Sequence, residues 1–107
     1  MKKEVVRNMS KEYMGTYEEI KNKKPMRLGE FVGGEENSFY VAKSENEVYE
    51  LSPLAYYVWM VCDGDHTVEE LIKAASEEID VDENDIIEPF IIALTSLVKA
   101  DLVKYVD

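Results

Sequence analysis

The sequence predicts an α+β fold in which a three-stranded antiparallel sheet is followed by three helices. Residues 27–51 contain short runs of strand-forming residues separated by polar links. Residues 52–99 contain apolar residues at helical spacing, with capping residues before each helix. This order of elements is winged-helix-like. With 107 residues, the chain is long enough for about one domain with a modest core.

Three short strands are predicted, over Arg27–Val32, Ser38–Lys43 and Glu47–Leu51. The glycine pair at 33–34 is a turn signal at the end of the first strand. The links are polar and of hairpin length, so the strands form a small meander that must pack on helices to be stable. A closing strand or extended tail over Leu102–Val106 can join this sheet.

The first two helices have clear start signals. Ser52 and Pro53 suit the N-cap and first position of one helix, and an Asp-Gly pair at 63–64 ends it. Thr67 with Glu70 forms a capping box for the next. The expected buried residues are Leu54, Tyr57, Val58, Val61 and Cys62 in the first helix and Val68, Leu71, Ile72, Ala75 and Ile79 in the second. Trp59 and Leu71 are expected where the two helices meet.

The third helix is more apolar than one buried stripe requires. It begins at Asp82 with Asp85, and Pro89 either bends it or moves its start to Glu88. Its apolar residues are Ile86, Ile87, Phe90, Ile91, Ile92, Ala93, Leu94, Leu97 and Val98. One stripe is expected in the core. The remainder, including Ile91, is expected to form a surface for a peptide, a second copy of the chain, or the N-terminal arm.

The N-terminal residues 1–27 are predicted as an arm or a short helix, and residues 28–107 as the domain. Ser10 can cap a helix with Tyr13, Tyr17 and Ile20 on one side, and Pro25 closes the segment.

Charge argues against nucleic acid as a partner. The net charge is −11, whereas nucleic-acid affinity depends on Lys and Arg contacts with phosphates. The third helix carries Glu83, Asp85 and Glu88 before its first cation, Lys99. A winged-helix nucleic-acid-binding protein remains an alternative because the helix order fits it.

No apolar run approaches the roughly 18 residues of a membrane span, and the N-terminus lacks the apolar core of a signal peptide. A single cysteine excludes an internal disulfide. The expected compartment is therefore the cytoplasm, with no membrane partner.

No catalytic or metal-binding set can be assembled from the sequence. Cys62 falls on the expected buried face without an acid–base partner, and the lone His66 lies in a turn. One Cys and one His cannot form a zinc site. We expect no enzymatic activity, no metal and no cofactor.

The segment Asp80–Ile91 resembles the start of a calcium loop at Asp80, Asp82 and Asn84. It then has Asp85 where the loop needs Gly and Ile91 where it needs Glu. These residues are better explained as helix caps.

Several short motifs together resemble the PqqD-like family, named for pyrroloquinoline quinone biosynthesis protein D and also called the RiPP recognition element. They are Leu51-Ser52-Pro53, Trp59, Cys62-Asp63-Gly64, Thr67-Val68-Glu69-Glu70-Leu71, Val81-Asp82 and Ala100-Asp101-Leu102-Val103. Asp101 stands where the family usually has Gly, and Pro89 replaces a helix-forming residue.

The resemblance implies a non-catalytic adaptor that holds the leader of a ribosomally made precursor peptide and presents it to a modifying enzyme, often a radical S-adenosylmethionine (SAM) enzyme. The leader would add as a strand to the third strand and lie against the third helix. Carried to this chain, the peptide-binding residues are Glu47, Val48, Tyr49, Glu50, Leu51, Ile87, Phe90, Ile91, Leu94 and Val98. Two other interpretations remain: the chain forms a homodimer through this surface, or it is a non-catalytic subunit that stabilises a partner protein.

Overall fold

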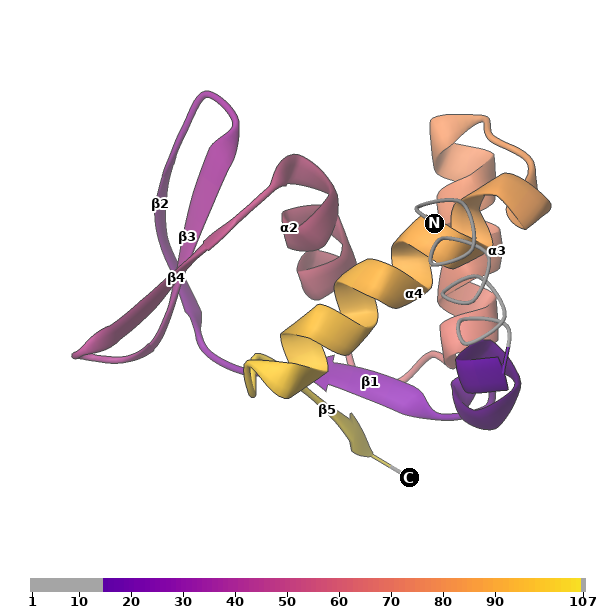
Figure 1. The fold of residues 1–107 in the computed structure, drawn as a ribbon, viewed down its shortest axis with the longest axis horizontal. Helices are drawn as coiled ribbons and strands as arrows, with labels where there is room; N and C mark the ends of the chain where they lie inside the picture. The colour runs from indigo at the N-terminus through magenta and orange to yellow at the C-terminus, as the bar shows by residue number, and fades with distance from the viewer. Residues whose placement is uncertain (1–14, 107) are drawn as a thin grey trace, which may run out of the picture.

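A computed structural model describes residues 15–106 and shows the predicted α+β architecture. Residues 15–20 are helical. The elements that follow are β1 (Lys24–Arg27), β2 (Glu30–Glu35), β3 (Ser38–Ser44), β4 (Glu47–Leu51), α2 (Pro53–Val61), α3 (Val68–Ile79), α4 (Glu83–Lys99) and β5 (Val103–Val106). The three-stranded antiparallel sheet has the order β2-β3-β4. Figure 1 shows α2 between this sheet and α4, with α3 farther from the sheet.

Strand β2 does not end at the glycine pair as predicted. It continues through Gly33 and Gly34 to Glu35, and the turn follows at residues 36–37. Pairing with β3 jumps from Phe31 to Gly33, so Val32 is an extra residue in a β-bulge. Gly33 has φ +146°, a conformation that favours glycine. The glycines therefore serve a bulge within the strand, not the turn after it.

The first predicted strand and the tail also pair differently from expectation. β1 pairs antiparallel with β5 in a separate two-stranded sheet, so the tail does not join the three-stranded sheet. Arg27 ends β1 and is not part of β2. Pro25 lies inside β1 and is buried, which an edge strand tolerates because its N–H need not enter a ladder.

Part of the segment before β1 packs on the rest of the protein. Tyr17 and Ile20 are only 8% and 7% exposed. Backbone N–H groups of Val68 and Glu69 donate to the carbonyls of Lys23 and Lys21 at 3.0 Å each. The suggested cap Ser10 and Tyr13 lie outside the described residues, and the domain boundary at 27/28 stays a prediction.

The helix caps form as the sequence predicts. The Ser52 side chain accepts from the Ala55 N–H, Thr67 and Glu70 form a reciprocal capping box, and Asp82 accepts from the Asn84 N–H. α4 begins at Glu83 and runs through Pro89, so the alternative start at Glu88 is wrong.

The core is organised around α4, which packs against both α2 and α3. Trp59 and Leu71 are buried as predicted, at 4% and 7% exposure. Their meeting at a junction of α2 and α3 stays a prediction. The indole N–H of Trp59 donates to the Leu28 carbonyl at 2.9 Å, so the nitrogen edge of the ring lies at the link between β1 and β2. Ile79, predicted as buried, is 45% exposed because it is the last residue of α3.

Candidate functional site

The strand β4 forms one edge of the three-stranded sheet, as predicted. It pairs with β3 through an antiparallel register that joins Tyr49 to Val41 and Leu51 to Phe39. Among residues 15–106, no further strand pairs with it. One side of β4 therefore offers backbone N–H and C=O groups that are not used within the sheet.

Side chains of β4 alternate between the two faces of the sheet. Leu51 is buried and Tyr49 is half-buried on the face that packs against α2. Val48 lies on the other face and is 53% exposed. Glu50 shares that face and accepts a hydrogen bond from the Ser38 hydroxyl at 2.5 Å. The edge thus combines an open backbone with one exposed apolar side chain.

The second edge, β2, is less regular. The bulge at Val32 lies in β2 itself. The pairing of β3 with β4 also has a register shift, but there the extra residue is Lys43 of β3, because Ala42 pairs with Val48 and Ser44 pairs with Glu47. The strand β4 itself is not interrupted. A bulge in an edge strand disrupts the row of backbone groups that another strand would need. β4 is therefore the edge better suited to strand addition.

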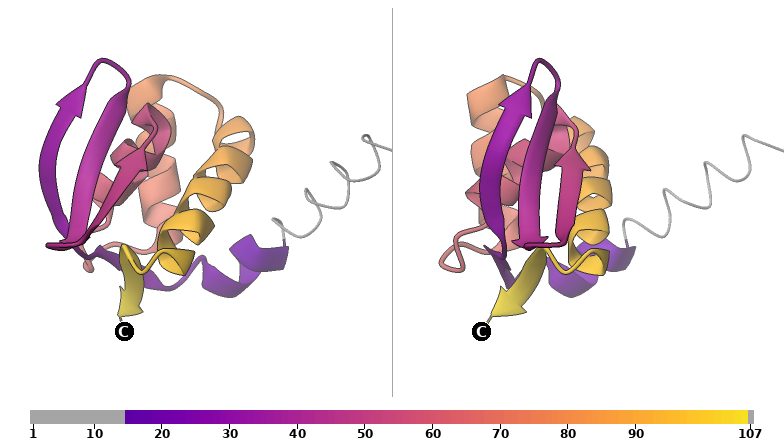
Figure 2. Two further views of the ribbon diagram at one scale, coloured as in Figure 1. Left: turned by 60° about the vertical axis from the view of Figure 1, so that its left-hand side comes forward. Right: turned by 90° about the vertical axis from the view of Figure 1, so that its left-hand side faces the viewer.

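The helix α4 lies on the β4 side of the sheet. In the right-hand view of Figure 2, β2 is at the opposite edge from α4. Lys43 on β3 also contacts Asp101, just after α4, with 3.2 Å between Nζ and Oδ2. The end of the sheet and the end of α4 are thus linked by an ion pair.

The predicted peptide-binding residues on α4 separate into two groups. Phe90, Ile91 and Leu94 have no exposed area, whereas Ile87 and Val98 are half-buried. The expectation that Ile91 is surplus to the core is wrong. Because α4 has neighbours on two sides, α2 and α3, it needs more than one apolar stripe to fill the core.

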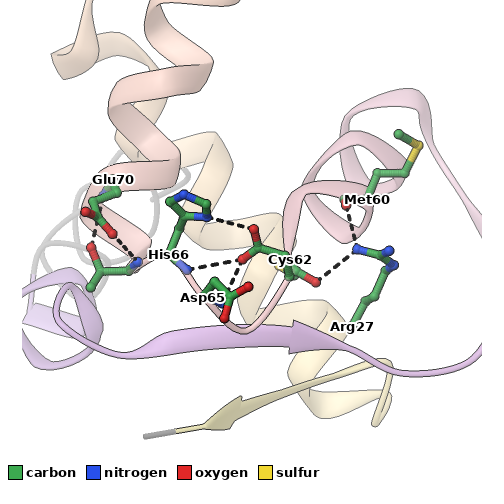
Figure 3. A network of polar contacts seen from close by, with 8 residues as sticks. Arg27, Met60, Cys62, Asp65, His66 and Glu70 are labelled. Atoms are coloured by element: carbon green, nitrogen blue, oxygen red, sulfur yellow. Dashed lines mark hydrogen bonds and ion pairs between the residues drawn. The ribbon is translucent and has the colours of Figure 1, made fainter.

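The loop between α2 and α3 holds a connected network of polar contacts (Figure 3). One carboxylate oxygen of Asp63 accepts from the N–H groups of Asp65 and His66 at 2.8 and 3.1 Å. Its other oxygen lies 2.7 Å from His66 Nδ1. Partial burial raises the pKa of Asp63, but these hydrogen bonds outweigh it and leave the pKa below its ordinary value. The hydrogen bond to Asp63 raises the pKa of His66.

Arg27 fastens the end of α2 to β1, an anchoring role that sequence reasoning missed. Its guanidinium donates to the carbonyls of Met60 at 3.0 Å and Cys62 at 3.3 Å (Figure 3). It also lies over the Trp59 ring, 5.8 Å from the centroid. No local pattern signals this role, because the residues that Arg27 contacts are more than 30 positions away.

Cys62 is unsuited to nucleophilic chemistry. It is fully buried, and burial raises the pKa of its thiol to about 12. Its sulfur is 3.1 Å from the Val58 carbonyl, to which the thiol donates. A thiol in this state is inert because the thiolate is the reactive form.

Two further findings concern residues 15–106. These residues contain no group of three or more His, Cys, Asp or Glu side chains placed to hold a metal ion. No helix in this part of the chain has the length and apolar character needed to cross a membrane.

Comparison with protein families gives a match over residues 36–103 to the family described as coenzyme PQQ synthesis protein D (PqqD). This stretch contains β3, β4 and the helices α2 to α4. The chain belongs to the PqqD family. Membership of the PqqD family fits a peptide-binding partner of a modifying enzyme. Comparisons with curated proteins and with solved structures found no match.

Proposed function

We propose that this PqqD-family protein binds the leader of a ribosomally made precursor peptide and presents it to a modifying enzyme, a radical SAM enzyme. The leader adds as a strand to the free side of β4, antiparallel or parallel to it, so its side chains lie alternately toward α4 and on the face that carries Val48. The observation that carries the proposal is the regular edge of β4, which no other strand among residues 15–106 covers, in a chain of this family.

Strand addition at β4 supplies two kinds of binding energy. Main-chain hydrogen bonds with Glu47–Leu51 give affinity that is independent of the peptide's side chains. Apolar contact with Val48, which is 53% exposed, adds a cross-strand pair worth about 0.2–1 kcal/mol. Together with contacts to α4, these terms are compatible with an affinity of about micromolar, near −8 kcal/mol.

On the helix side, the proposal assigns direct contact with the peptide to Ile87 and Val98. Both are half-buried and retain area that a ligand can cover. Phe90, Ile91 and Leu94 have no exposed area. In the proposal they do not contact the peptide but hold α4 in position by packing in the core. This division refines the set of ten residues that the family resemblance implies.

Charge supports a leader that is apolar or basic near β4. Glu45, in the turn before β4, and Glu47, its first residue, are exposed, and the chain as a whole carries a net charge of −11. Lys or Arg beside the apolar part of a leader would be attracted to this edge, and acidic residues would be repelled.

The test compares two valines that are equally exposed on opposite edges, Val48 at 53% and Val32 at 52%. The probe is a synthetic leader peptide, taken from a precursor gene if the genome carries one beside this gene, and it is titrated calorimetrically into each variant. Val48→Asp should weaken binding about tenfold, which corresponds to about 1.4 kcal/mol. Val32→Asp should bind as the wild type does.

The opposite result, with Val32→Asp impaired and Val48→Asp normal, would move the site to β2 and refute the assignment. Equal binding by all three proteins would exclude both edges. Circular dichroism of each variant shows whether the fold is retained. Gel filtration of the protein with a radical SAM enzyme from the same genome tests the enzyme part of the proposal separately.

A further inference from the structure

The exposed side of α2 carries no charged side chain. The helix, Pro53–Val61, contains no Asp, Glu, Lys or Arg, and a helix that is apolar all round is normally buried on every side. Here Pro53 and Met60 are exposed, Met60 by 48%. An apolar helix side that stays open is a candidate for contact with a partner.

A row of aromatic rings extends this side of α2 onto the sheet. Tyr56 precedes Met60 by one helical turn, so both project from the same side of the helix. The ring centroid of Tyr56 lies 5.3 Å from that of Phe31 on β2 and 6.0 Å from that of Trp59. Phe31 is 44% exposed and pairs with the buried Val41, so it is on the α2 side of the sheet.

Arg27 places a cation at the end of this row. Its guanidinium lies 5.8 Å from the centroid of the Trp59 ring. It also donates to the carbonyl groups of Met60 at 3.0 Å and Cys62 at 3.3 Å, at the end of α2 (Figure 3). A side chain that is already fixed loses little conformational entropy when a partner binds. We call Arg27, Phe31, Tyr56 and Met60 the Arg27–α2 surface.

The guanidinium of Arg27 has donors that no carboxylate uses. It carries five N–H groups, and both of its hydrogen bonds within residues 15–106 come from Nη1. No ion pair in that part of the chain includes Arg27. Asp63 lines the same pocket, but its carboxylate accepts from the N–H groups of Asp65 and His66 and contacts the His66 ring. Nε and Nη2 of Arg27 can therefore bind a carboxylate from a partner, through two parallel hydrogen bonds.

The charges on this side of the sheet favour such a carboxylate. Residues 21–27 contain four Lys or Arg and no Asp or Glu, so the segment that ends in Arg27 is positive. Glu30 and Glu35 belong to the face of the sheet that is turned away from α2, because each pairs with a β3 residue adjacent to one that packs against the core. The local charge is thus opposite in sign to the net charge of −11.

Glu78 contacts α2 from the other side. It accepts a hydrogen bond from the Tyr57 hydroxyl at 3.3 Å. Tyr57 lies about 200° around the helix from Trp59, the residue whose ring Arg27 covers. Arg27 and Glu78 therefore border opposite sides of the exposed part of α2, and a carboxylate is favoured on the Arg27 side.

Two other occupants fit less well. A second copy placed by a two-fold axis would bring the Arg27–α2 surface against itself, and this surface contains no carboxylate for Arg27. Nucleic acid is disfavoured by the net charge of −11, because its affinity depends on many phosphate contacts. An acidic and apolar protein segment satisfies both parts of the surface.

We propose that the Arg27–α2 surface binds a protein segment in which Asp or Glu stands beside apolar or aromatic side chains. The carboxylate binds Arg27, and the apolar side chains cover Met60 and Phe31. This partner is opposite in charge to the leader proposed for β4, and its binding does not depend on that proposal.

The experiment follows the amide and indole N–H chemical shifts of the isotope-labelled full chain. The probes are three hexapeptides, EELFEE, EESSEE and KKLFKK. EELFEE should shift the signal of the single indole, that of Trp59, and the amides around Met60 and Phe31. It should bind at least about tenfold more tightly than either other peptide, a difference of about 1.4 kcal/mol.

Two variants that add the same charge locate the site. Met60→Glu supplies a carboxylate beside Arg27 and should weaken EELFEE binding at least about tenfold, or about 1.4 kcal/mol. Val48→Glu adds the same charge on the β4 edge at a similarly exposed position, 53% against 48%, and should bind EELFEE as the wild type does. Arg27 itself is left unchanged because it also holds the end of α2.

Every other outcome overturns the proposal. Absence of shifts with millimolar EELFEE would exclude the site. Equal binding of EESSEE would show charge attraction alone, and equal binding of KKLFKK would show that Arg27 selects nothing. Equal weakening by both variants would make the net charge responsible. Shifts confined to β4 would place the peptide in the leader site and leave the proposed function untouched.

The spectrum of each variant shows whether the fold is retained. If Met60→Glu proves unfolded, Phe31→Ser repeats the measurement and should weaken EELFEE binding. Its control is Val32→Ser, which alters the neighbouring residue of β2, 52% exposed, and should not. Equal binding by these two variants would refute the assignment.

Discussion

Two neighbouring isoleucines of α4 give a stringent test of the core described above. Ile91 has no exposed area and Ile92 is 38% exposed. Replacing Ile91 by Asp should unfold the protein, whereas Ile92→Asp should leave it folded. The helix propensity of the new residue is the same in both variants, so the difference reports burial alone.

The magnitude follows from two terms. Removing a fully buried Ile side chain costs about 2–5 kcal/mol through lost contacts and the cavity left behind. Burying a carboxylate without a partner adds several kcal/mol more, or forces the group to become neutral. The sum equals or exceeds much of the roughly 5–15 kcal/mol by which a domain of this kind is stable. Ile92→Asp incurs neither cost in full, because the side chain at position 92 is exposed to solvent.

Urea unfolding followed by circular dichroism measures the effect, with Ile92→Asp as the control. A cooperative transition within about 1 kcal/mol of wild type is expected for Ile92→Asp, as for most surface changes. An Ile91→Asp variant that unfolds at the same urea concentration as wild type would show that α4 does not pack as described. Ile91 would then have to be on the surface.

Two further predictions concern ionisable groups. The Asp63–His66 pair should stabilise the loop most between its two titrations, since its contribution is lost as pH rises through the raised pKa of His66 and as pH falls through the lowered pKa of Asp63. In a magnetic-resonance titration His66 should titrate above about 6.5, and Asp63→Asn should lower the midpoint; an unchanged midpoint would contradict the pairing. Cys62, with a pKa of about 12, should react with dithiobis-nitrobenzoate only after unfolding, and rapid reaction of the native protein would refute its burial.

The helices were predictable because their signals are local. Ser52, Thr67 and Asp82 each cap a helix through bonds that span two or three residues, and such bonds leave a recognisable pattern in sequence. The hairpin of β3 and β4 was also found in the predicted place, with β4 at the edge. Family motifs then directed attention to β4.

The errors arose where distant segments decide the outcome. Gly33 and Gly34 are compatible with a turn or a bulge, and only pairing with β3 selects the bulge. Lys24–Arg27 is a strand because Val103–Val106 pairs with it, and Pro25 locally argues against a strand. Ile91 is buried because α4 has two helical neighbours, which the apolar pattern of one helix cannot reveal.

The pairing of β1 with β5 has a consequence for synthesis on the ribosome. Lys24 pairs with Val106, and Arg27 with Val103. The strand β1 therefore leaves the ribosome well before β5, the strand with which it pairs. Until β5 emerges, β1 has only its backbone hydrogen bonds with Cys62 and Gly64, and the Leu28 N–H lacks the Leu102 carbonyl to which it donates at 2.8 Å. The hairpins and helices can form before that point, but β1 gains its strand partner only after Val103–Val106 has left the ribosome.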